Sequence, residues 1–164
     1  MQFSTFFFTL SAFAGLTLAA PTSDTTCQRV LSFERGFRVI NSNLLYVSHN
    51  QTLTFTLPAN APGPCTLIAD FPAHFSIDDD SVANGGAPSP INVFDVDDPA
   101  RGSLVGTFSF PSELPDREIK KATKLTINSF ACREKMTFVL TAVNSGAVMF
   151  IPKDNAGLFV EYGC

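Results

Sequence analysis

Apolar residues alternate with threonine and serine along much of this chain, and this period of two restricts its fold more than any other feature of the sequence. In residues 52–57, Leu53, Phe55 and Leu57 alternate with three threonines. Successive side chains of a β-strand point to opposite faces, so such a segment has one apolar and one polar face. The pattern predicts further strands at residues 44–47, 65–71, 91–96, 104–110, 124–130, 136–143, 148–151 and 158–162 and, with a less regular alternation, at 30–33 and 37–40.

Turn-forming residues separate these segments. They are found at residues 48–51, 58–64, 84–86, 97–99 and 144–146. Short strands joined in this way are typical of antiparallel sandwiches and barrels. We therefore predict an all-β fold, an antiparallel two-sheet β-sandwich of the jelly-roll or immunoglobulin-like type. Its core is expected to contain Leu53, Phe55, Leu67, Val93, Phe108, Ile127, Phe138 and Leu140.

Two segments do not follow the strand pattern. Residues 112–122 have a helix-like composition, with Pro115 near the start, and can equally form a charged loop. Residues 78–90 are the longest polar stretch rich in glycine and proline, and we expect them to form the most mobile loop.

The start of the chain predicts secretion. The first residues carry no charged side chain, and residues 6–18 are almost entirely apolar and lead to Ala19 and Ala20. This is the pattern of a signal peptide cleaved after one of these alanines, although its start lacks Lys and Arg. A run of about thirteen residues is shorter than the roughly 20 that a membrane-spanning helix needs. We therefore divide the chain into a signal peptide, residues 1–20, and a single β-sandwich domain, residues 21–164.

The charge balance limits the class of partner. The chain has 15 acidic and 11 basic residues, a net charge of −4, and no polybasic segment. Nucleic acids and anionic membranes attract clusters of positive charge, so neither is expected as a partner. The sequence ends at Cys164 without a hydrophobic tail, which argues against a lipid anchor. We expect a secreted monomer without a cofactor.

All four cysteines follow the expected cleavage site. An even number in a secreted chain indicates complete pairing, and the wide spacing does not match the closely spaced ligands of a zinc site. Cys65 and Cys132 lie at the ends of two predicted strands, while Cys27 and Cys164 lie at the two ends of the domain. Chain termini often lie close together, so among three pairings the sequence favours Cys27–Cys164 with Cys65–Cys132 nested inside.

The segment Asn50-Gln51-Thr52 matches the acceptor pattern for N-glycosylation. It lies in the polar stretch 48–51, which we predict to be the tip of a hairpin that a transferase can reach. Asn50 is therefore a candidate glycosylation site. The alternative is that early folding of the following strand hides the acceptor.

Two acidic clusters raise the hypothesis of a calcium site, because Ca²⁺ needs several oxygen ligands in one shell. Neither cluster has the spacing of an EF-hand loop, and acidic loop residues are more often solvated turn-formers. We therefore predict no metal. The candidate ligands, should calcium bind, are Asp78, Asp80, Asp95 and Asp97.

No catalytic residue can be assigned from the sequence. There is no GxSxG motif, and His74 has the surroundings of a loop residue and not of a general base. A carboxylate pair of the glycosidase type can be hidden among five acids, but the sequence does not pair them. These acids are Asp70, Asp95, Asp97, Glu134 and Glu161. A sugar-binding platform of exposed aromatic side chains is disfavoured too, since the chain has no tryptophan and its phenylalanines fall mostly on apolar strand faces.

Several segments resemble one known family. They are residues 63–72 (GPCTLIADFP), 91–96 (INVFDV), 102–107 (GSLVGT), 126–133 (TINSFACR) and 157–164 (GLFVEYGC). Together they resemble the fungal family described as the ubiquitin 3 binding protein C-terminal domain, over about residues 50–164. The resemblance implies a fungal, β-rich secreted domain with no catalytic residues to transfer. The family is named after a member said to contact the activating enzyme of a ubiquitin-like modifier inside cells, a role that a secreted, disulfide-bonded chain is not expected to share.

These observations favour a non-enzymatic extracellular protein that acts at the fungal cell wall or at a host or environmental surface. Its partner is expected to be a surface polysaccharide or protein. One alternative is a small carbohydrate-active enzyme that uses a carboxylate pair. Another is a calcium-dependent binding module built from the two acidic clusters.

Overall fold

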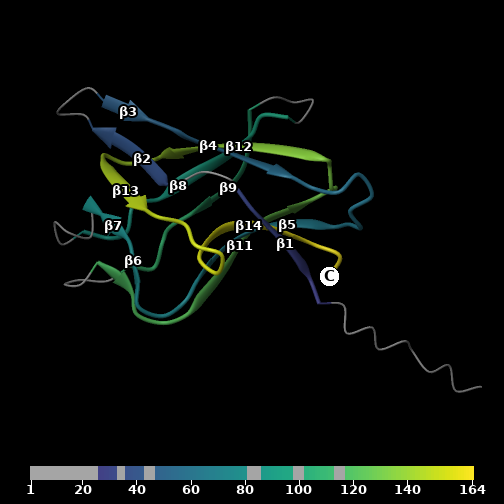
Figure 1. Ribbon diagram of the computed structural model, residues 1–164. Coiled ribbons are helices and arrows are strands. Elements are labelled where there is room, and N and C mark those ends of the chain that lie inside the picture. The colour runs from purple at the N-terminus through teal and green to yellow at the C-terminus, as the bar shows by residue number, and fades with distance from the viewer. Residues whose placement is uncertain (1–25, 33–35, 43–46, 81–85, 98–101, 113–116) are drawn as a thin grey trace, which may run out of the picture.

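The computed structural model describes residues 26–32, 36–42, 47–80, 86–97, 102–112 and 117–164 (Figure 1). The expected signal peptide lies outside the described residues. Strands make up nearly all of the described secondary structure, which confirms the all-β prediction. No helix within these ranges is long and apolar enough to cross a membrane.

The strands follow the alternation in the sequence closely. They are β1 (Gln28–Leu31), β2 (Phe37–Ser42), β3 (Val47–His49), β4 (Gln51–Thr56), β5 (Cys65–Phe71), β6 (Phe75–Ser76), β7 (Asp78–Asp79), β8 (Ile91–Asp95), β9 (Ser103–Phe108), β10 (Glu118–Ile119), β11 (Thr123–Phe130), β12 (Lys135–Ala142), β13 (Gly146–Phe150) and β14 (Gly157–Tyr162). The predictions at residues 65–71, 91–96 and 124–130 agree with β5, β8 and β11 to within one residue. Of the prediction at residues 44–47, only Val47 is described.

These strands form three four-stranded sheets and a two-stranded ribbon. Sheet A has the order β1-β14-β5-β11, sheet B the order β3-β2-β13-β7, and sheet C the order β4-β12-β8-β9. Strands β6 and β10 form the ribbon. Every described pairing is antiparallel, as predicted.

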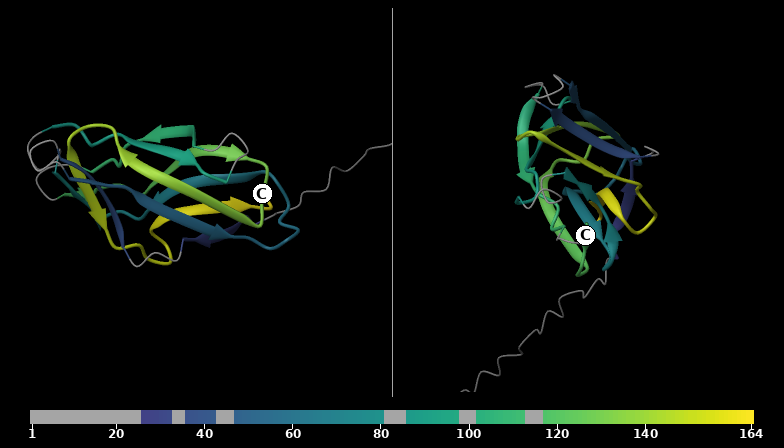
Figure 2. Two further views of the ribbon diagram at one scale, coloured as in Figure 1. Left: turned by 90° about the horizontal axis from the view of Figure 1, so that it is seen from above. Right: turned by 90° about the vertical axis from the view of Figure 1, so that its left-hand side faces the viewer.

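Sheet A forms one layer of the sandwich, and sheets B and C together form the other (Figures 1 and 2). Phe130 of sheet A contacts Phe138 of sheet C, with ring centroids 5.4 Å apart. Phe71 of sheet A contacts Phe150 of sheet B at 5.3 Å. The sandwich is thus confirmed, but its second layer is divided into two sheets. The strands of sheets B and C are not hydrogen-bonded into one ladder. The chain passes from sheet B to sheet C at Asn50, the single residue between β3 and β4.

The inward faces of the strands meet in one hydrophobic core. The expected core residues that are no more than 2% exposed are Leu53, Phe55, Leu67, Val93, Phe138 and Leu140. Phe108 and Ile127 are only partly buried and pack against this core. Their strands, β9 and β11, are edge strands that meet at the side of the sandwich, and the pairing of β11 with β5 shifts register beside Ile127.

The segment with helix-like composition contains a strand. Within residues 112–122, Glu118 and Ile119 form β10 and pair with β6, while residues 113–116 lie outside the described part. Ile119 is fully buried, so its contribution to the core decides the local conformation over helix propensity. Of residues 78–90, which we expected to form one mobile loop, Asp78 and Asp79 instead form β7 and pair with β13, while residues 81–85 lie outside the described part.

Two disulfides staple the sandwich. Cys27, just before β1, is bonded to Cys164 at the carboxyl end of the chain. Cys65, at the start of β5, is bonded to Cys132, which follows β11. This is the nested arrangement that the positions of the cysteines favoured.

Candidate functional site

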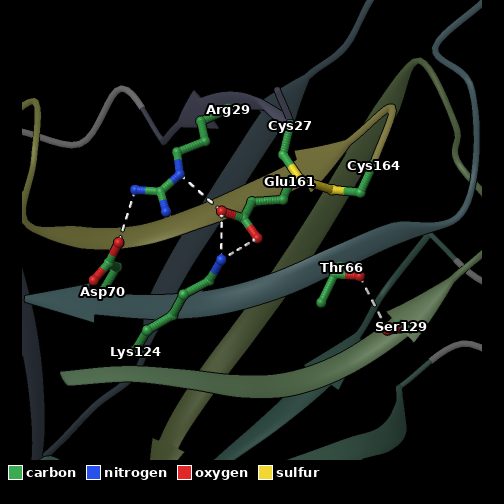
Figure 3. A network of polar contacts seen from close by, with 8 residues as sticks. All are labelled: Cys27, Arg29, Thr66, Asp70, Lys124, Ser129, Glu161 and Cys164. Carbon is green, nitrogen blue, oxygen red and sulfur yellow. Dashed lines mark hydrogen bonds and ion pairs between the residues drawn. A yellow bond between two sulfur atoms is a disulfide. The ribbon is translucent and has the colours of Figure 1, made fainter. Parts of the chain in front are cut away.

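Polar side chains cross the outer face of sheet A in a row (Figure 3). Pairing places Arg29 opposite Glu161, Glu161 opposite Thr66, and Thr66 opposite Ser129. Because side chains alternate along each strand, paired residues share a face of the sheet. The hydroxyl oxygens of Thr66 and Ser129 are 3.0 Å apart and share a hydrogen bond.

Glu161 is the centre of this row. Its Oε1 accepts hydrogen bonds from Nε of Arg29 at 2.8 Å and from Nζ of Lys124 at 2.9 Å, and its Oε2 lies 2.7 Å from the same Nζ. Arg29 also donates from a terminal nitrogen to Oδ2 of Asp70 at 2.7 Å. The two cations and two anions balance, so this cluster has no net charge. We call these four residues the sheet A network.

The sheet A network favours the charged form of Arg29. Partial burial lowers the pKa of Arg29, but the hydrogen bond to Asp70 and the negative charges of Glu161 and Asp70 outweigh this effect and raise the pKa above its ordinary value. The network also lies beside apolar groups: Ile68 and Phe159 pair with each other on the same face and are buried, and the Arg29 guanidinium lies over the Phe159 ring, 5.6 Å from its centre. These contacts describe a stabilising cap over the sheet.

The structure therefore brings together two of the five acids that the sequence left unpaired, Asp70 and Glu161, but binds both to the same arginine. Asp95 is elsewhere, buried in the inner face of β8 and ion-paired with Arg133. The backbone N–H of Asp97 donates to Oδ1 of Asp95 at 3.0 Å. Glu134 is exposed in the turn before β12.

The two acidic clusters lie at opposite ends of β8. Asp79 is fully buried and accepts hydrogen bonds from the backbone N–H of Ser89 at 3.1 Å and from its hydroxyl at 3.3 Å, just before β8 begins. Asp95 is the last residue of the same strand. Asp78 is ion-paired with Arg117. A calcium site that joins both clusters is therefore not supported by the fold.

One group of potential metal ligands is found among the described residues: Cys27, Cys164 and Glu161, whose ligand atoms lie within 4.8 Å of one another. The two sulfur atoms are bonded to each other and are not thiolates, so this group is not a metal site in the oxidised protein. His74 is a loop residue, as expected from the sequence. Its side chain is 76% exposed, with Nδ1 3.2 Å from Oε1 of Glu118.

An open groove lies on the outer face of sheet B. Its floor consists of alternate residues of two neighbouring strands, Arg38, Ile40 and Ser42 of β2 and Ala147 and Met149 of β13. The pairing sets Met149 opposite Arg38 and Ala147 opposite Ile40, so these side chains share one face. Their neighbours along the strands, such as Val39 and Val148, point into the core.

The walls of this groove come from two connecting segments, residues 86–90 and the turn at 144–146. Both are fixed to the sandwich. The buried carboxylate of Asp79 binds Ser89, and the backbone N–H of Val143 donates to the carbonyl of Pro90 at 2.9 Å. The groove has a volume of about 770 Å³. We call it the sheet B groove.

Arg38 contributes one positive charge to the lining of the sheet B groove. Its backbone N–H donates to Oε1 of Gln51 at 3.0 Å, which fixes the strand, while the side chain is exposed. In the described part of the chain, no carboxylate forms an ion pair with this guanidinium. Asp80 also lines the groove but is engaged in another contact. Arg38 can therefore bind an anionic group that enters the groove.

Sequence reasoning missed the sheet B groove. Its floor joins residues 38–42 and 147–149, whose pairing is not visible in the sequence. The one local signal is Arg38 itself, a charged residue within the apolar segment 37–40.

Asn50 is exposed, as a glycosylation acceptor must be, but the predicted hairpin around it is wrong. Strand β3 pairs with β2, and β4 pairs with β12, so the chain at Asn50 passes from one sheet to another. Strands β3 and β4 are therefore not paired with each other across Asn50.

Comparison with known proteins gave no match: no family model fits the chain, and neither a curated protein nor a solved structure is significantly similar to it. The resemblance to the ubiquitin 3 binding protein C-terminal domain family therefore stays a prediction.

Proposed function

We propose that this protein is a secreted, non-enzymatic binding protein that acts at the fungal cell wall or at a host or environmental surface. The observation that carries the proposal is the sheet B groove, whose floor presents the guanidinium of Arg38, which has no ion-pair partner among the described residues, beside apolar side chains. Its volume of about 770 Å³ lies within the roughly 300–1,000 Å³ of ligand-binding clefts. Its floor is formed by paired strands and its walls are held by hydrogen bonds, an arrangement that reduces the ordering needed on binding.

The ion pairs of the acidic residues support a binding function over catalysis. A glycosidase needs one carboxyl group that can donate a proton and another that can act as base or nucleophile, both facing a cleft. Asp70 and Glu161 instead share Arg29 on the outer face of sheet A, and Asp95 is paired with Arg133. Each of these carboxylates therefore contacts a cation of the protein and does not form a pair facing a cleft.

Secretion is part of the same proposal. Two disulfides are compatible with an extracellular protein, because such bonds persist in oxidising compartments. The apolar start of the chain, residues 6–18, supports export. The fungal wall is the setting that the family resemblance implies.

The ligand that best fits the sheet B groove is a polymer chain that carries carboxylates. Apolar contacts with Ile40 and Met149 suit the flat face of a sugar ring or a side chain, while Arg38 suits a carboxylate. Among wall and plant-surface polysaccharides, polygalacturonate has this chemistry, whereas chitin and neutral glucans do not. An acidic protein segment is the other ligand of this type.

The test is a binding assay on immobilised polygalacturonate, chitin and β-glucan, with the soluble sugars measured in parallel. We expect retention on polygalacturonate without release of sugar. Replacing Arg38 with Gln should weaken retention about tenfold, the effect of losing about 1.4 kcal/mol of binding free energy. Lys121→Gln is the matched control, because it removes the same charge from an exposed residue outside the groove.

Each of three results would contradict a different part of the proposal. Released oligosaccharides would indicate an enzyme. Retention that Arg38→Gln and Lys121→Gln weaken equally would indicate a non-specific charge effect. Retention on none of the three polymers would exclude the polysaccharide ligand and leave an acidic protein segment, which a peptide of alternating Asp and Gly would probe.

A further inference from the structure

We infer that Asn50 is N-glycosylated during secretion, and that the topology of the sandwich keeps this acceptor accessible until the transfer is complete. The inference concerns the β3–β4 junction and is independent of what binds in the sheet B groove.

The two acceptor residues, Asn50 and Thr52, point to the opposite side of the strand from Gln51, which lies between them. Gln51 is buried, and its side chain binds the backbone of two strands. Its Oε1 accepts from the N–H of Arg38 in β2 at 3.0 Å, and its Nε2 donates to the carbonyl of Thr52 in β4 at 3.2 Å. Asn50 and Thr52 are exposed. The amide that receives the sugar and the hydroxyl that the acceptor motif requires therefore both face solvent, while Gln51 fixes the strand from inside.

The order of strand pairing answers the question of whether early folding hides the acceptor. Among the described strands, β4 is an edge strand with β12 as its one partner, and Thr52 is opposite Val139. Val139 lies 87 residues (139 minus 52) further along the chain. At about 5–20 residues per second, synthesis needs roughly 4–17 s to cover this distance. During that time Thr52 has no partner strand, so the acceptor segment can adopt the extended form that a transferase binds.

The preceding strand does not hide the acceptor either. In the described part of the chain, β3 is paired with β2, which is synthesised just before it, and this pairing ends at His49 opposite Ile40. Asn50 lies outside that ladder. Asn50 therefore lies between β3, which can pair with β2 early, and β4, whose partner β12 is synthesised later.

The transfer is a substitution at the first sugar of a lipid-linked pyrophosphate oligosaccharide. The side-chain nitrogen of Asn50 forms a bond to C1 of that sugar. The bond between C1 and the pyrophosphate oxygen breaks, that oxygen keeps the electron pair, and the amide loses one proton to the medium. No oxidation or reduction is involved. Because Asn50 faces outward, the attached glycan leaves the core contacts of the neighbouring Gln51 and Leu53 unchanged.

The experiment expresses the full chain in a eukaryotic secretory host and measures the mass of the secreted protein before and after enzymatic removal of N-glycans. We expect one glycan on the unmodified chain and on Thr52→Ser, and none on Asn50→Gln or Thr52→Val. Thr54→Val is the matched control, because it makes the same substitution on the same face of β4 and should keep the glycan. All variants should have circular dichroism spectra of a folded β-protein, since each change affects an outward residue.

A second arm tests the timing. Addition of dithiothreitol to the cells during synthesis prevents disulfide formation and delays folding, and we expect the glycosylated fraction to stay the same. A fraction that rises under dithiothreitol would show that folding competes with transfer and would overturn the argument from strand order. Absence of a glycan in both conditions, or a glycan that persists in Asn50→Gln, would overturn the assignment of the site.

Discussion

At the scale of single residues, Glu161 is a nearly buried carboxylate on the outer face of sheet A and depends on its cationic partners. Its side chain is only 6% exposed, and it accepts hydrogen bonds from both Arg29 and Lys124. A buried carboxylate is stable only when its charge is compensated, and here two cations compensate it. Arg29 also forms a second ion pair, with Asp70. Removing Glu161 therefore leaves two cations side by side, whereas removing Asp70 leaves Arg29 with one partner.

This difference predicts the order of two neutral variants. Glu161→Gln should lower the free energy of unfolding by about 1–3 kcal/mol, because hydrogen bonds between charged groups are lost and two cations are left next to each other. Asp70→Asn should cost less, about 0–1 kcal/mol, since its ion pair with Arg29 is more exposed. Urea denaturation near neutral pH is the measurement. An equal or larger loss for Asp70→Asn would contradict the central role of Glu161.

Arg29 stays positively charged throughout that measurement. Its pKa is raised in the folded state, so its contribution to stability is fully present below the pKa of the unfolded chain. That contribution is lost only as the pH rises through the raised pKa, far into the alkaline range. The comparison of the two variants can therefore be made at any pH near neutral.

At the scale of elements, the side of the sandwich is closed where β9 meets β11. These strands belong to different sheets, and they approach so closely that a Cβ atom built on Gly106 lies 3.0 Å from both Cγ2 and the carbonyl oxygen of Ile127. Nδ2 of Asn128 donates to the carbonyl of Val105 at the same place. Only glycine allows this contact without a shift of the backbone.

Gly106→Ala should therefore reduce the free energy of unfolding by about 1–3 kcal/mol, the usual cost of forcing extra atoms into a packed contact. The control is Gly36→Ala, because a Cβ atom there meets no atom within 4 Å and no left-handed backbone conformation is required. That variant should be neutral or slightly more stable, since alanine restricts the unfolded chain. Thermal denaturation of both proteins is the measurement, and equal melting temperatures would show that β9 is free to move away from β11.

The elements also show what alternation can and cannot predict. Long strands such as β5 and β11 were found because seven or more residues repeat the pattern. The short strands β6, β7 and β10 have two residues each and were missed, because two residues cannot show a period. The hairpin expected around Asn50 was wrong for another reason: alternation locates strands, but partner strands are chosen by packing over the whole sandwich.

At the scale of the whole molecule, the sequence predicted the sandwich and most of its core but not the sheet B groove. The core follows from local patterns, because inward residues such as Phe55 and Phe138 are apolar within apolar-polar repeats. The groove needs the pairing of β2 with β13, which lie more than a hundred residues apart in the sequence, and the anchoring of residues 86–90 by Asp79. Neither contact leaves a local signal.

The disulfides act at the same scale, because each connects distant parts of the chain. The Cys27–Cys164 bond spans a separation of 137 residues and the Cys65–Cys132 bond one of 67. In the chain-entropy model, closing loops of this length stabilises the fold by about 5 and about 4 kcal/mol. Cys65 is also fully buried, whereas Cys27 and Cys164 are exposed, so replacing Cys65 removes packing contacts as well.

We therefore predict that replacing either pair with alanine destabilises the protein by about 4–5 kcal/mol, a large part of the roughly 5–15 kcal/mol that holds a typical domain folded. Both double variants should be secreted poorly compared with the unmodified chain, as measured by immunoblotting of the culture medium. The connectivity itself is checked by tandem mass spectrometry of peptides prepared without reduction. Peptides that link Cys27 to Cys164 and Cys65 to Cys132 are expected, and a peptide that links Cys27 to Cys65 would refute the nested arrangement.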